Sequence, residues 1–210
     1  MLLIQHTIKD FTTLLASDAP APGGGSAAAL MGTLGISLAN MVGALTAGRA
    51  KYAQHTDFIA KLLKRSERIQ SDFLAVIDED TQAFNEVSAV FEMPKETDAD
   101  KAARKQAMQA ALKTCVGPPF KMMELSLEAI ELTRQAMDKT NTSAASDLGV
   151  AALSLKAAVQ SAWLNILINI GGINDAAFAD EYRQKSETIL KKALPLADEI
   201  YHCIQESLWR

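Results

Sequence analysis

Residues 22–48 read PGGGSAAALMGTLGISLANMVGALTAG, and this run contains no charged residue. It opens on three glycines whose backbone N–H groups are unshielded by side chains, Gly23, Gly24 and Gly25. Ser26 follows and is a residue type that caps helices. The run therefore predicts a buried helix over about residues 26–52. Its start is either a site for an anionic or carbonyl-rich ligand group or only a tight turn.

The composition of the 210 residues argues against several classes of function. The formal net charge is −4, so nothing indicates a nucleic-acid surface. Cys115 and Cys203 are the only cysteines, and neither they nor the three histidines show metal-ligand spacing. We expect free thiols and no metal. Because the N-terminus lacks a signal-peptide pattern, we also expect a cytoplasmic protein.

Helical periodicity runs through nearly the whole sequence, and no run alternates β-branched and polar residues as a strand would. Stop signals fall at Met93-Pro94, at Gly117-Pro118-Pro119 and at Gly171-Gly172. The prediction is an all-α, single-domain bundle of long antiparallel helices over residues 1–210. The uncharged run is long enough for a membrane span, but its many glycine, serine and threonine residues favour a buried helix, so we expect no membrane partner.

One carboxylate stands on an apolar face of the predicted third helix. The residues that share this face at spacings of three and four are Phe73, Ile77, Asp80, Phe84, Val87 and Phe91. A carboxylate facing the core loses hydration, which raises its pKa and suits it to accept and donate a proton near neutral pH. Asp80 is therefore the candidate acid/base. The alternative is a structural aspartate bonded to a nearby helix end.

Two other predicted helices carry stripes of small and polar residues. One stripe contains Ser26, Thr33, Ser37, Asn40, Ala44, Ala47 and Lys51, and the other contains Asp147, Ala151, Ser154, Ala158, Ser161, Asn165 and Asn169. Buried amides need hydrogen-bond partners, which a polar heterocycle supplies as well as another helix does. The stripes predict either one ligand cleft shared with Asp80 or close packing between helices.

Six short motifs add a resemblance to these observations. They are PGGGS at 22–26, GRAKY at 48–52, DEDTQAF at 78–84, MPK at 93–95, NTSAASDLGVAA at 141–152 and NILIN at 165–169. In this order and spacing, the sequence resembles the cyclodeaminase family. That family comprises the C-terminal domain of formiminotransferase-cyclodeaminase and stand-alone bacterial relatives, some described as methenyltetrahydrofolate cyclohydrolases.

The resemblance implies an all-helical homodimeric folate enzyme whose only small-molecule requirement is its tetrahydrofolate substrate, with no metal or redox cofactor. It also implies an acid/base role for Asp80, which the helical face indicates independently. Ala50 departs from the family, whose members often have a basic residue there. The formiminotransferase half is absent, so we do not expect formimino transfer. A homodimer is expected as well because the two most apolar helices exceed what one bundle covers.

Folate chemistry distributes the remaining candidates. Arg49 and Lys51, with the N–H groups of the glycines, are expected to meet the anionic glutamate tail. Amide and carboxylate side chains are expected to meet the pterin. The full set of predicted substrate-binding residues is Gly23, Gly24, Gly25, Ser26, Asn40, Arg49, Lys51, Asn141, Asp147, Asn165 and Asn169.

Two reactions and one binding function stay open at this point. The first reaction cyclises 5-formiminotetrahydrofolate to 5,10-methenyltetrahydrofolate with loss of ammonia. The alternative interconverts 5,10-methenyl- and 10-formyltetrahydrofolate. Both reactions take one proton and give one at the same bridge carbon, so Asp80 serves either. A non-catalytic, folate-binding helical dimer is the third interpretation.

Overall fold

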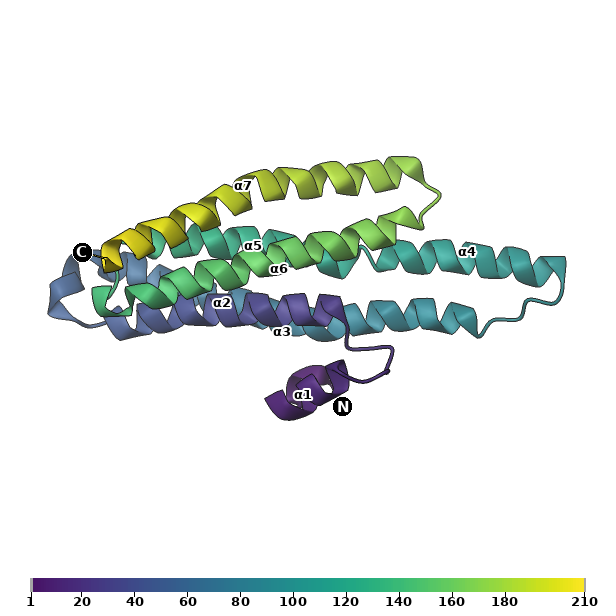
Figure 1. Ribbon diagram of the computed structural model, residues 1–210, viewed down its shortest axis with the longest axis horizontal. Coiled ribbons are helices and arrows are strands. Elements are labelled where there is room, and N and C mark those ends of the chain that lie inside the picture. Colours follow the sequence, from purple (N-terminus) through teal and green to yellow (C-terminus); the bar gives the residue numbers. More distant parts are fainter. Residues whose placement is uncertain (1, 210) are drawn as a thin grey trace.

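The computed structural model describes residues 2–209, which contain helices and no strand. Figure 1 shows long helices lying side by side. The α-helices are α1 (Ile8–Leu15), α2 (Gly24–Thr46), α3 (Thr56–Phe91), α4 (Asp98–Thr114), α5 (Gly117–Ala136), α6 (Ala145–Gly171) and α7 (Ala176–Leu208). Short 3₁₀ helices are η1 (Leu3–Gln5), η2 (Ala50–His55) and η3 (Thr142–Ala144). The predicted all-α bundle is confirmed.

Local sequence sets most of the helix boundaries. Thr97 caps α4 in a capping box with Asp100, and Asp175 caps α7 by accepting from the N–H of Phe178. The Gly-Pro-Pro segment at 117–119 ends α4 and starts α5, so the two helices run end to end alongside α3 (Figure 1). The break at Gly117-Pro118-Pro119 lies where the sequence predicted a stop signal.

Glycines hold α2 in the centre of the fold, between α3 and α6. A Cβ at Gly32 would lie 2.5 Å from Cζ of Phe73 on α3, and one at Gly35 would lie 2.7 Å from Cγ of Leu155 on α6. Both approaches are too close for any other residue. The α2 helix thus packs tightly on α3 and α6, and its first turn is fixed against both.

Both predicted ends of this helix need correction. It ends at Thr46 rather than near residue 52, because Gly48 adopts a φ of +73° and the chain continues as the 3₁₀ helix η2. It begins at Gly24 with Gly23 as its N-cap, so Ser26 lies inside the first turn and does not cap the helix. The hydroxyl of Ser26 is therefore available for other bonds.

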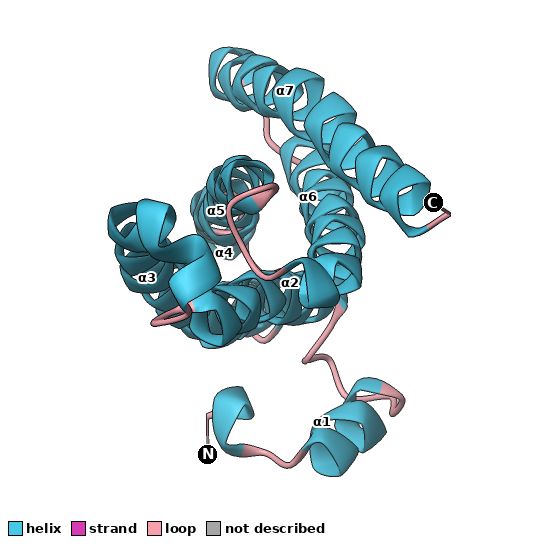
Figure 2. Ribbon diagram, turned by 90° about the vertical axis from the view of Figure 1, so that its left-hand side faces the viewer, coloured by secondary structure: helices cyan, strands magenta, loops and turns pink. Residues whose placement is uncertain are grey.

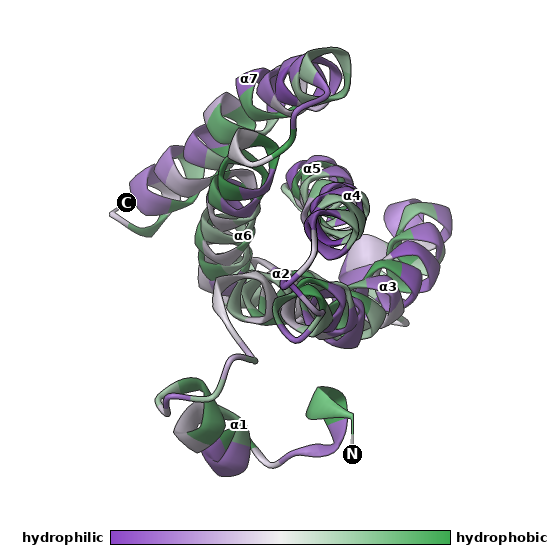
Figure 3. Ribbon diagram, turned by 90° about the vertical axis from the view of Figure 1, so that its right-hand side faces the viewer, coloured by the Kyte–Doolittle hydropathy of each residue, from purple (hydrophilic) through white to green (hydrophobic). Residues whose placement is uncertain are grey.

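The α2 and α6 helices are only partly covered by the rest of the chain. By length and composition alone, α2 and the segment Thr142–Gly171 would suffice to cross a membrane, a test that core helices also pass. About half of the α2 window and 39% of the α6 window are buried. In Figure 3, α6 is mostly green or pale, whereas α7 alternates green with purple. The outer face of α6 is thus unusually apolar.

Candidate active site

Asp80 lies on α3 directly against the first turn of α2. Its carboxylate is so close to Gly25 that a Cβ built there would lie 2.5 Å from Cγ of Asp80, and nearer still to Oδ1. The Ser26 hydroxyl donates to Oδ2 of Asp80 at 3.2 Å and also lies 3.3 Å from the carbonyl oxygen of Ile77. The sequence placed Asp80 and the glycines in separate motifs, and the fold brings them into contact.

Burial raises the pKa of Asp80 above the ordinary aspartate value. The hydroxyl and backbone N–H of Ser26 oppose this effect, because hydrogen bonds to the charged form lower the pKa. Burial dominates, so the protonated form is populated at higher pH than in an exposed aspartate. This environment suits a group that exchanges protons near neutral pH.

The raised pKa predicts a pH-dependent stability difference for Asp80→Asn. The native state binds a proton that the unfolded state has released, so wild-type stability falls as pH rises from the ordinary aspartate pKa through the raised one. Asparagine does not titrate. The free energy of unfolding of Asp80→Asn, relative to wild type, should therefore rise across that interval and then level off. Urea denaturation of both proteins at a series of pH values measures it, and a pH-independent difference would contradict the assignment.

A pocket of about 330 Å³ opens beside Asp80. Its walls come from the first turn of α2, from the middle of α3 and from the ends of α4 and α6; residues lining it include Gly23, Gly24, Gly25, Asp80, Thr81, Phe84, Leu112, Cys115, Asn165, Ile168 and Asn169. Three of the predicted elements therefore converge on one cavity, as the sequence suggested. The pocket has a mostly apolar lining with a few polar groups, among them Asp80, Asn165 and Asn169.

The two asparagines on α6 are held by bonds to backbone carbonyls. Asn165 Nδ2 donates to the carbonyl of Ser161 at 2.8 Å, and Asn169 Nδ2 donates to that of Cys115 at 2.7 Å. Within residues 2–209, the Oδ1 atoms of both amides accept no hydrogen bond from protein. These oxygens are the acceptors that a ligand with N–H groups would meet.

The apolar face that identified Asp80 is only partly in the core. Phe73, Ile77 and Val87 are buried, but Phe84 is 39% exposed and Phe91 is 63% exposed. The prediction that these two phenylalanines face the core is wrong. The face leaves the bundle near Asp80, so Phe84 becomes a wall of the pocket. The period of the sequence shows which residues share one face of a helix. It does not show how far along the helix the neighbouring helices cover that face.

The predicted tail-binding residues do not reach this pocket within one chain. Arg49 and Lys51 follow the C-terminal end of α2, whereas Asp80 contacts its N-terminal end. At 1.5 Å per residue, the helix separates the two ends by about 30 Å. The prediction that Arg49 and Lys51 act together with the backbone N–H groups of Gly24 and Gly25 is therefore wrong for a single chain.

Asn141 and Asp147 lie at that same far end. The backbone N–H of Asn141 donates to Oγ1 of Thr46 at 2.8 Å, and its side chain accepts from the N–H of Ser143. The N–H of Thr142 donates to the hydroxyl of Tyr52 at 3.1 Å. These bonds tie the start of α6 to the end of α2. The predicted single cleft along both stripes is thus wrong, because its members divide between the two ends of the bundle.

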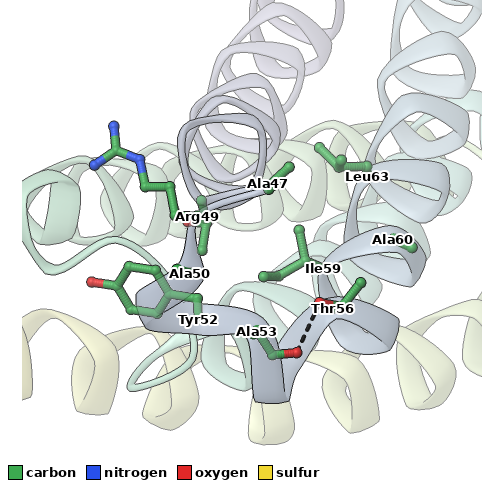
Figure 4. A pocket seen from close by; sticks show the side chains of 11 residues that line it. Ala47, Arg49, Ala50, Tyr52, Ala53, Thr56, Ile59, Ala60 and Leu63 are labelled. Atoms are coloured by element: carbon green, nitrogen blue, oxygen red, sulfur yellow. Dashed lines mark hydrogen bonds between the residues drawn. The ribbon is translucent and has the colours of Figure 1, made fainter.

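A second, mostly apolar cavity of about 240 Å³ lies at this far end (Figure 4). It is lined by the segment after α2 and by the start of α3. Figure 4 shows the Arg49 side chain pointing away from the cavity, whereas Tyr52 is buried and its hydroxyl accepts from the N–H of Thr142. The cavity has none of the candidate acid/base groups.

Asn40 has a partner within the protein and is absent from the lining of the Asp80 pocket. Its Oδ1 accepts from the Ser66 hydroxyl at 2.7 Å, which joins the middle of α2 to α3. A neighbouring helix thus supplies the hydrogen-bond partner that this partly buried amide needs, and substrate contact by Asn40 stays a prediction.

Cys115 is one of the pocket wall residues that sequence reasoning did not predict, together with Thr81, Leu112 and Ile168. It is buried, its Sγ lies 3.2 Å from the carbonyl oxygen of Ala83, and its pKa is raised to about 11 by burial and by the nearby carboxylate of Asp80. It is therefore a neutral thiol at physiological pH. A lone cysteine without a neighbouring motif gives no sequence signal for such a place.

Comparison with known proteins supplies the family. The protein-family model described as formiminotransferase-cyclodeaminase matches residues 7–188 of this chain. Over 204 residues, the chain is 38% identical to methenyltetrahydrofolate cyclohydrolase of Methylorubrum extorquens, covering 97% of this chain and 98% of that protein. It is 29% identical over 191 residues to formimidoyltransferase-cyclodeaminase of Rattus norvegicus, spanning 91% of this chain but 35% of that longer protein.

The fold has a close relative among solved structures. The crystal structure of formiminotetrahydrofolate cyclodeaminase from Thermotoga maritima superposes with a TM-score of 0.87 over 98% of both chains, at 21% identity. The two chains share one helical fold. Since the family model spans most of the sequence and the cyclohydrolase matches it along nearly its whole length, the chain belongs to the formiminotransferase-cyclodeaminase family.

Proposed function

We propose that this chain is a folate one-carbon enzyme, a methenyltetrahydrofolate cyclohydrolase that uses Asp80 as its acid/base. The observation that carries the proposal is the partly buried carboxylate of Asp80 on the wall of an open pocket, beside the Oδ1 atoms of Asn165 and Asn169. The full-length relative named as a cyclohydrolase favours this reaction over others in the family. We also propose that residues 1–210 form one helical domain.

The reaction requires one proton acceptor and one proton donor near the bridge carbon. Asp80, as carboxylate, takes a proton from the attacking water while oxygen bonds to the methenyl carbon. The resulting carboxylic acid then protonates N5 as the bond between N5 and the bridge carbon breaks, which leaves 10-formyltetrahydrofolate. The hydroxyl on the bridge carbon loses its remaining proton to solvent as the formyl C=O forms, so the cationic methenyl substrate and water give 10-formyltetrahydrofolate and one released proton, and no electron is transferred. The proposed chemistry thus uses no cofactor beyond the tetrahydrofolate substrate.

Pocket polarity fits the pterin part of such a substrate. The Oδ1 atoms of Asn165 and Asn169 accept from the pterin amide and amino groups, while Phe84, Leu112 and Ile168 provide apolar contact for the ring faces. Asp80 lies beside the first turn of α2, which is the positive end of the helix dipole and carries free N–H groups. That end stabilises the aspartate anion which accepts the proton.

The second candidate is the cyclodeaminase reaction. The same chain resembles bifunctional formimidoyltransferase-cyclodeaminases and shares the fold of a formiminotetrahydrofolate cyclodeaminase. In this reaction Asp80 takes the N10 proton as N10 attacks the formimino carbon, and then protonates the departing ammonia. The substrate skeleton and the proton path are common to both reactions.

Purified protein incubated separately with methenyltetrahydrofolate and with 5-formiminotetrahydrofolate tests the proposal. Loss of the methenyl absorbance from the first, faster than in buffer, supports the cyclohydrolase. Gain of that absorbance from the second supports the cyclodeaminase instead. Binding of both folates with turnover of neither would leave the non-catalytic folate-binding dimer and would overturn the proposal.

Ser26→Ala should shift the acid limb of the profile of kcat/KM against pH to higher pH. The wild-type Ser26 hydroxyl stabilises the charged form of Asp80, so its removal raises the pKa of Asp80 further. Because the base form of Asp80 starts the reaction, kcat/KM should reach half of its plateau at a higher pH than in wild type. The plateau itself should fall less than the midpoint shift alone would suggest, because above the raised pKa Asp80 is again in its base form. An unmoved midpoint would show that Asp80 does not set this limb.

A further inference from the structure

Two hydroxyls and one carboxylate form a hydrogen-bonded cluster where α2 meets α3. Figure 2 shows α2 between α3 and α6. On the α3 side, Ser26 Oγ lies 3.2 Å from Oδ2 of Asp80 and 3.3 Å from Oγ1 of Thr81. It also lies 3.3 Å from the carbonyl oxygen of Ile77. Ser26 is fully buried, whereas Asp80 and Thr81 both line the pocket of about 330 Å³. Thr81 thus presents a second oxygen to the pocket, directly beside the acid/base.

The hydroxyl of Thr81 is bonded differently from other hydroxyls inside the helices. A serine or threonine within a helix commonly donates to the carbonyl four residues earlier, as Thr33 and Thr133 do in this chain. For Thr81 that carbonyl belongs to Ile77, and Ser26 approaches it instead. Within residues 2–209, the hydrogen-bond partner of the Thr81 hydroxyl is Ser26 Oγ. The Thr81 hydroxyl is therefore turned toward α2 rather than back along its own helix.

The charge of Asp80 fixes the direction of these bonds. Ser26 has one hydroxyl proton, and a carboxylate attracts it more strongly than a neutral carbonyl or hydroxyl does. With Asp80 ionised, Ser26 therefore donates to Asp80, and Ser26 Oγ is left to accept from Thr81. The proton of Thr81 is then committed to Ser26. Toward the pocket, Thr81 offers lone pairs, so it accepts a hydrogen bond there and does not donate one.

Two acceptors, the carboxylate of Asp80 and the hydroxyl oxygen of Thr81, thus stand together on the pocket wall. Both lie near one shared oxygen, Ser26 Oγ, at 3.2 and 3.3 Å. A second oxygen at the same two distances, on the pocket side, can therefore contact both. A water in that position donates one hydrogen to each acceptor, which leaves its lone pairs directed into the pocket. This is the orientation that a nucleophilic water needs.

We propose that Thr81 holds the water that attacks the bridge carbon of methenyltetrahydrofolate, and so directs this site toward hydrolysis. The inference rests on the proposed function for its substrate. Asp80 takes one hydrogen of the water as a proton while the water oxygen bonds to the methenyl carbon, and Thr81 accepts a hydrogen bond from the other hydrogen.

The protons then leave by two routes. The proton on Asp80 passes to N5 as the bond between N5 and the bridge carbon breaks. The hydrogen that Thr81 holds stays on the new hydroxyl until that step, and it is released to solvent as the formyl C=O forms. Thr81 stays neutral throughout, so its role is to orient the water and not to carry a proton.

The cyclodeaminase reaction provides the contrast, because N10 of the substrate attacks the formimino carbon there and no water takes part. That reaction needs the proton exchange of Asp80 but not a held water. Loss of the Thr81 hydroxyl should therefore slow hydrolysis much more than cyclodeamination. Asp80 serves both reactions and cannot separate them, whereas Thr81 can.

Thr81→Val and Thr81→Ser test this role. Valine keeps the shape of threonine without the hydroxyl, and serine keeps the hydroxyl without the methyl group. Thr81→Val should lower kcat for hydrolysis of methenyltetrahydrofolate by about tenfold to a hundredfold, less than Asp80→Asn, since Asp80 still holds one hydrogen of the water. Thr81→Ser should keep kcat within about threefold of wild type. The dissociation constant of tetrahydrofolate, which has no bridge carbon to attack, should stay unchanged in both.

Thr188→Val is the matched control for loss of a threonine hydroxyl. Thr188 is exposed on α7, donates to the carbonyl of Gln184 at 2.8 Å and lies outside the pocket. Its kcat should equal that of wild type. Thermal unfolding of all the variants shows that folded proteins are being compared.

The profile of kcat/KM against pH separates a residue that holds water from one that acts through Asp80. Thr81→Val should move the midpoint less than Ser26→Ala does, because Ser26 and not Thr81 bonds to the carboxylate. Asp80 and Cys115 are the titratable groups among the residues that line the pocket, and Cys115 is a neutral thiol. The first turn of α2 and the α6 wall contribute no titratable group.

Wild-type kcat in Thr81→Val, or an equal loss in Thr81→Val and Thr81→Ser, overturns the role of Thr81. If Asp80→Asn is inactive in the same assay, the proposed function still stands in that case. Where wild type also converts 5-formiminotetrahydrofolate, an equal loss of both reactions in Thr81→Val likewise overturns the inference. A wild type that converts neither folate, or the formimino compound alone, overturns the proposed function and this inference with it.

Discussion

Asp80→Asn is expected to lower kcat by about 10²- to 10⁴-fold, the usual contribution of general acid–base catalysis. The amide keeps the volume of the carboxylate and can still accept from the Ser26 hydroxyl, so the fold and the pocket shape should persist. It cannot take a proton from water or give one to N5. Folate affinity should stay within several-fold of wild type, and steady-state kinetics with a separate binding titration measures both.

Glu79→Gln is the matched control for this change. Glu79 is the preceding residue, lies half-exposed outside the pocket and pairs with Lys121 at 3.0 Å. Loss of an exposed ion pair changes stability by about 1 kcal/mol or less, so kcat should be nearly unchanged. Near-wild-type kcat in folded Asp80→Asn would refute the catalytic assignment. Asp147 would then be the next carboxylate to test.

Gly25→Ala is expected to lower kcat by at least about 10²-fold, the scale of a 1 Å misplacement at a reacting centre. The added methyl would overlap the Asp80 carboxylate, with Cβ only 2.5 Å from Cγ. Asp80 must turn away or α2 must shift, and either change separates the carboxylate from the Ser26 hydroxyl. Overpacking of this kind also costs about 1–3 kcal/mol of folding free energy.

Gly24→Ala provides the comparison, because a Cβ at Gly24 meets only Asn165, at an ordinary 3.7 Å. Its folding free energy and kcat should stay close to those of wild type. Thermal unfolding and kcat of the two alanine variants, measured together, separate a local clash from a general intolerance of side chains in this turn. Equal kcat in both variants would mean that the Asp80 carboxylate is free to move without loss.

Much of the fold and one catalytic candidate were predictable from sequence, because their signals are local. Helical periodicity, the capping box at Thr97 and the Gly-Pro-Pro break each act over a few residues. Asp80 was identifiable because it is a carboxylate among apolar residues that recur every three or four positions on the same helix. The partners of that carboxylate were not predictable, since contact with Gly25 depends on how α2 and α3 pack.

The sequence by itself determined an all-α chain of the formiminotransferase-cyclodeaminase family with a carboxylate where the core should be. Tertiary structure alone decided which candidates share a site. Asp80, Asn165 and Asn169 line one pocket. Asn40 instead accepts a hydrogen bond from Ser66, and Arg49 and Lys51 lie at the far end of the bundle. The physical reason is the rigidity of a helix: a period places residues on one face, but each turn also moves them 5.4 Å along the axis. Residues on one stripe of α2 therefore face the same side of the helix but lie up to the full length of the helix apart.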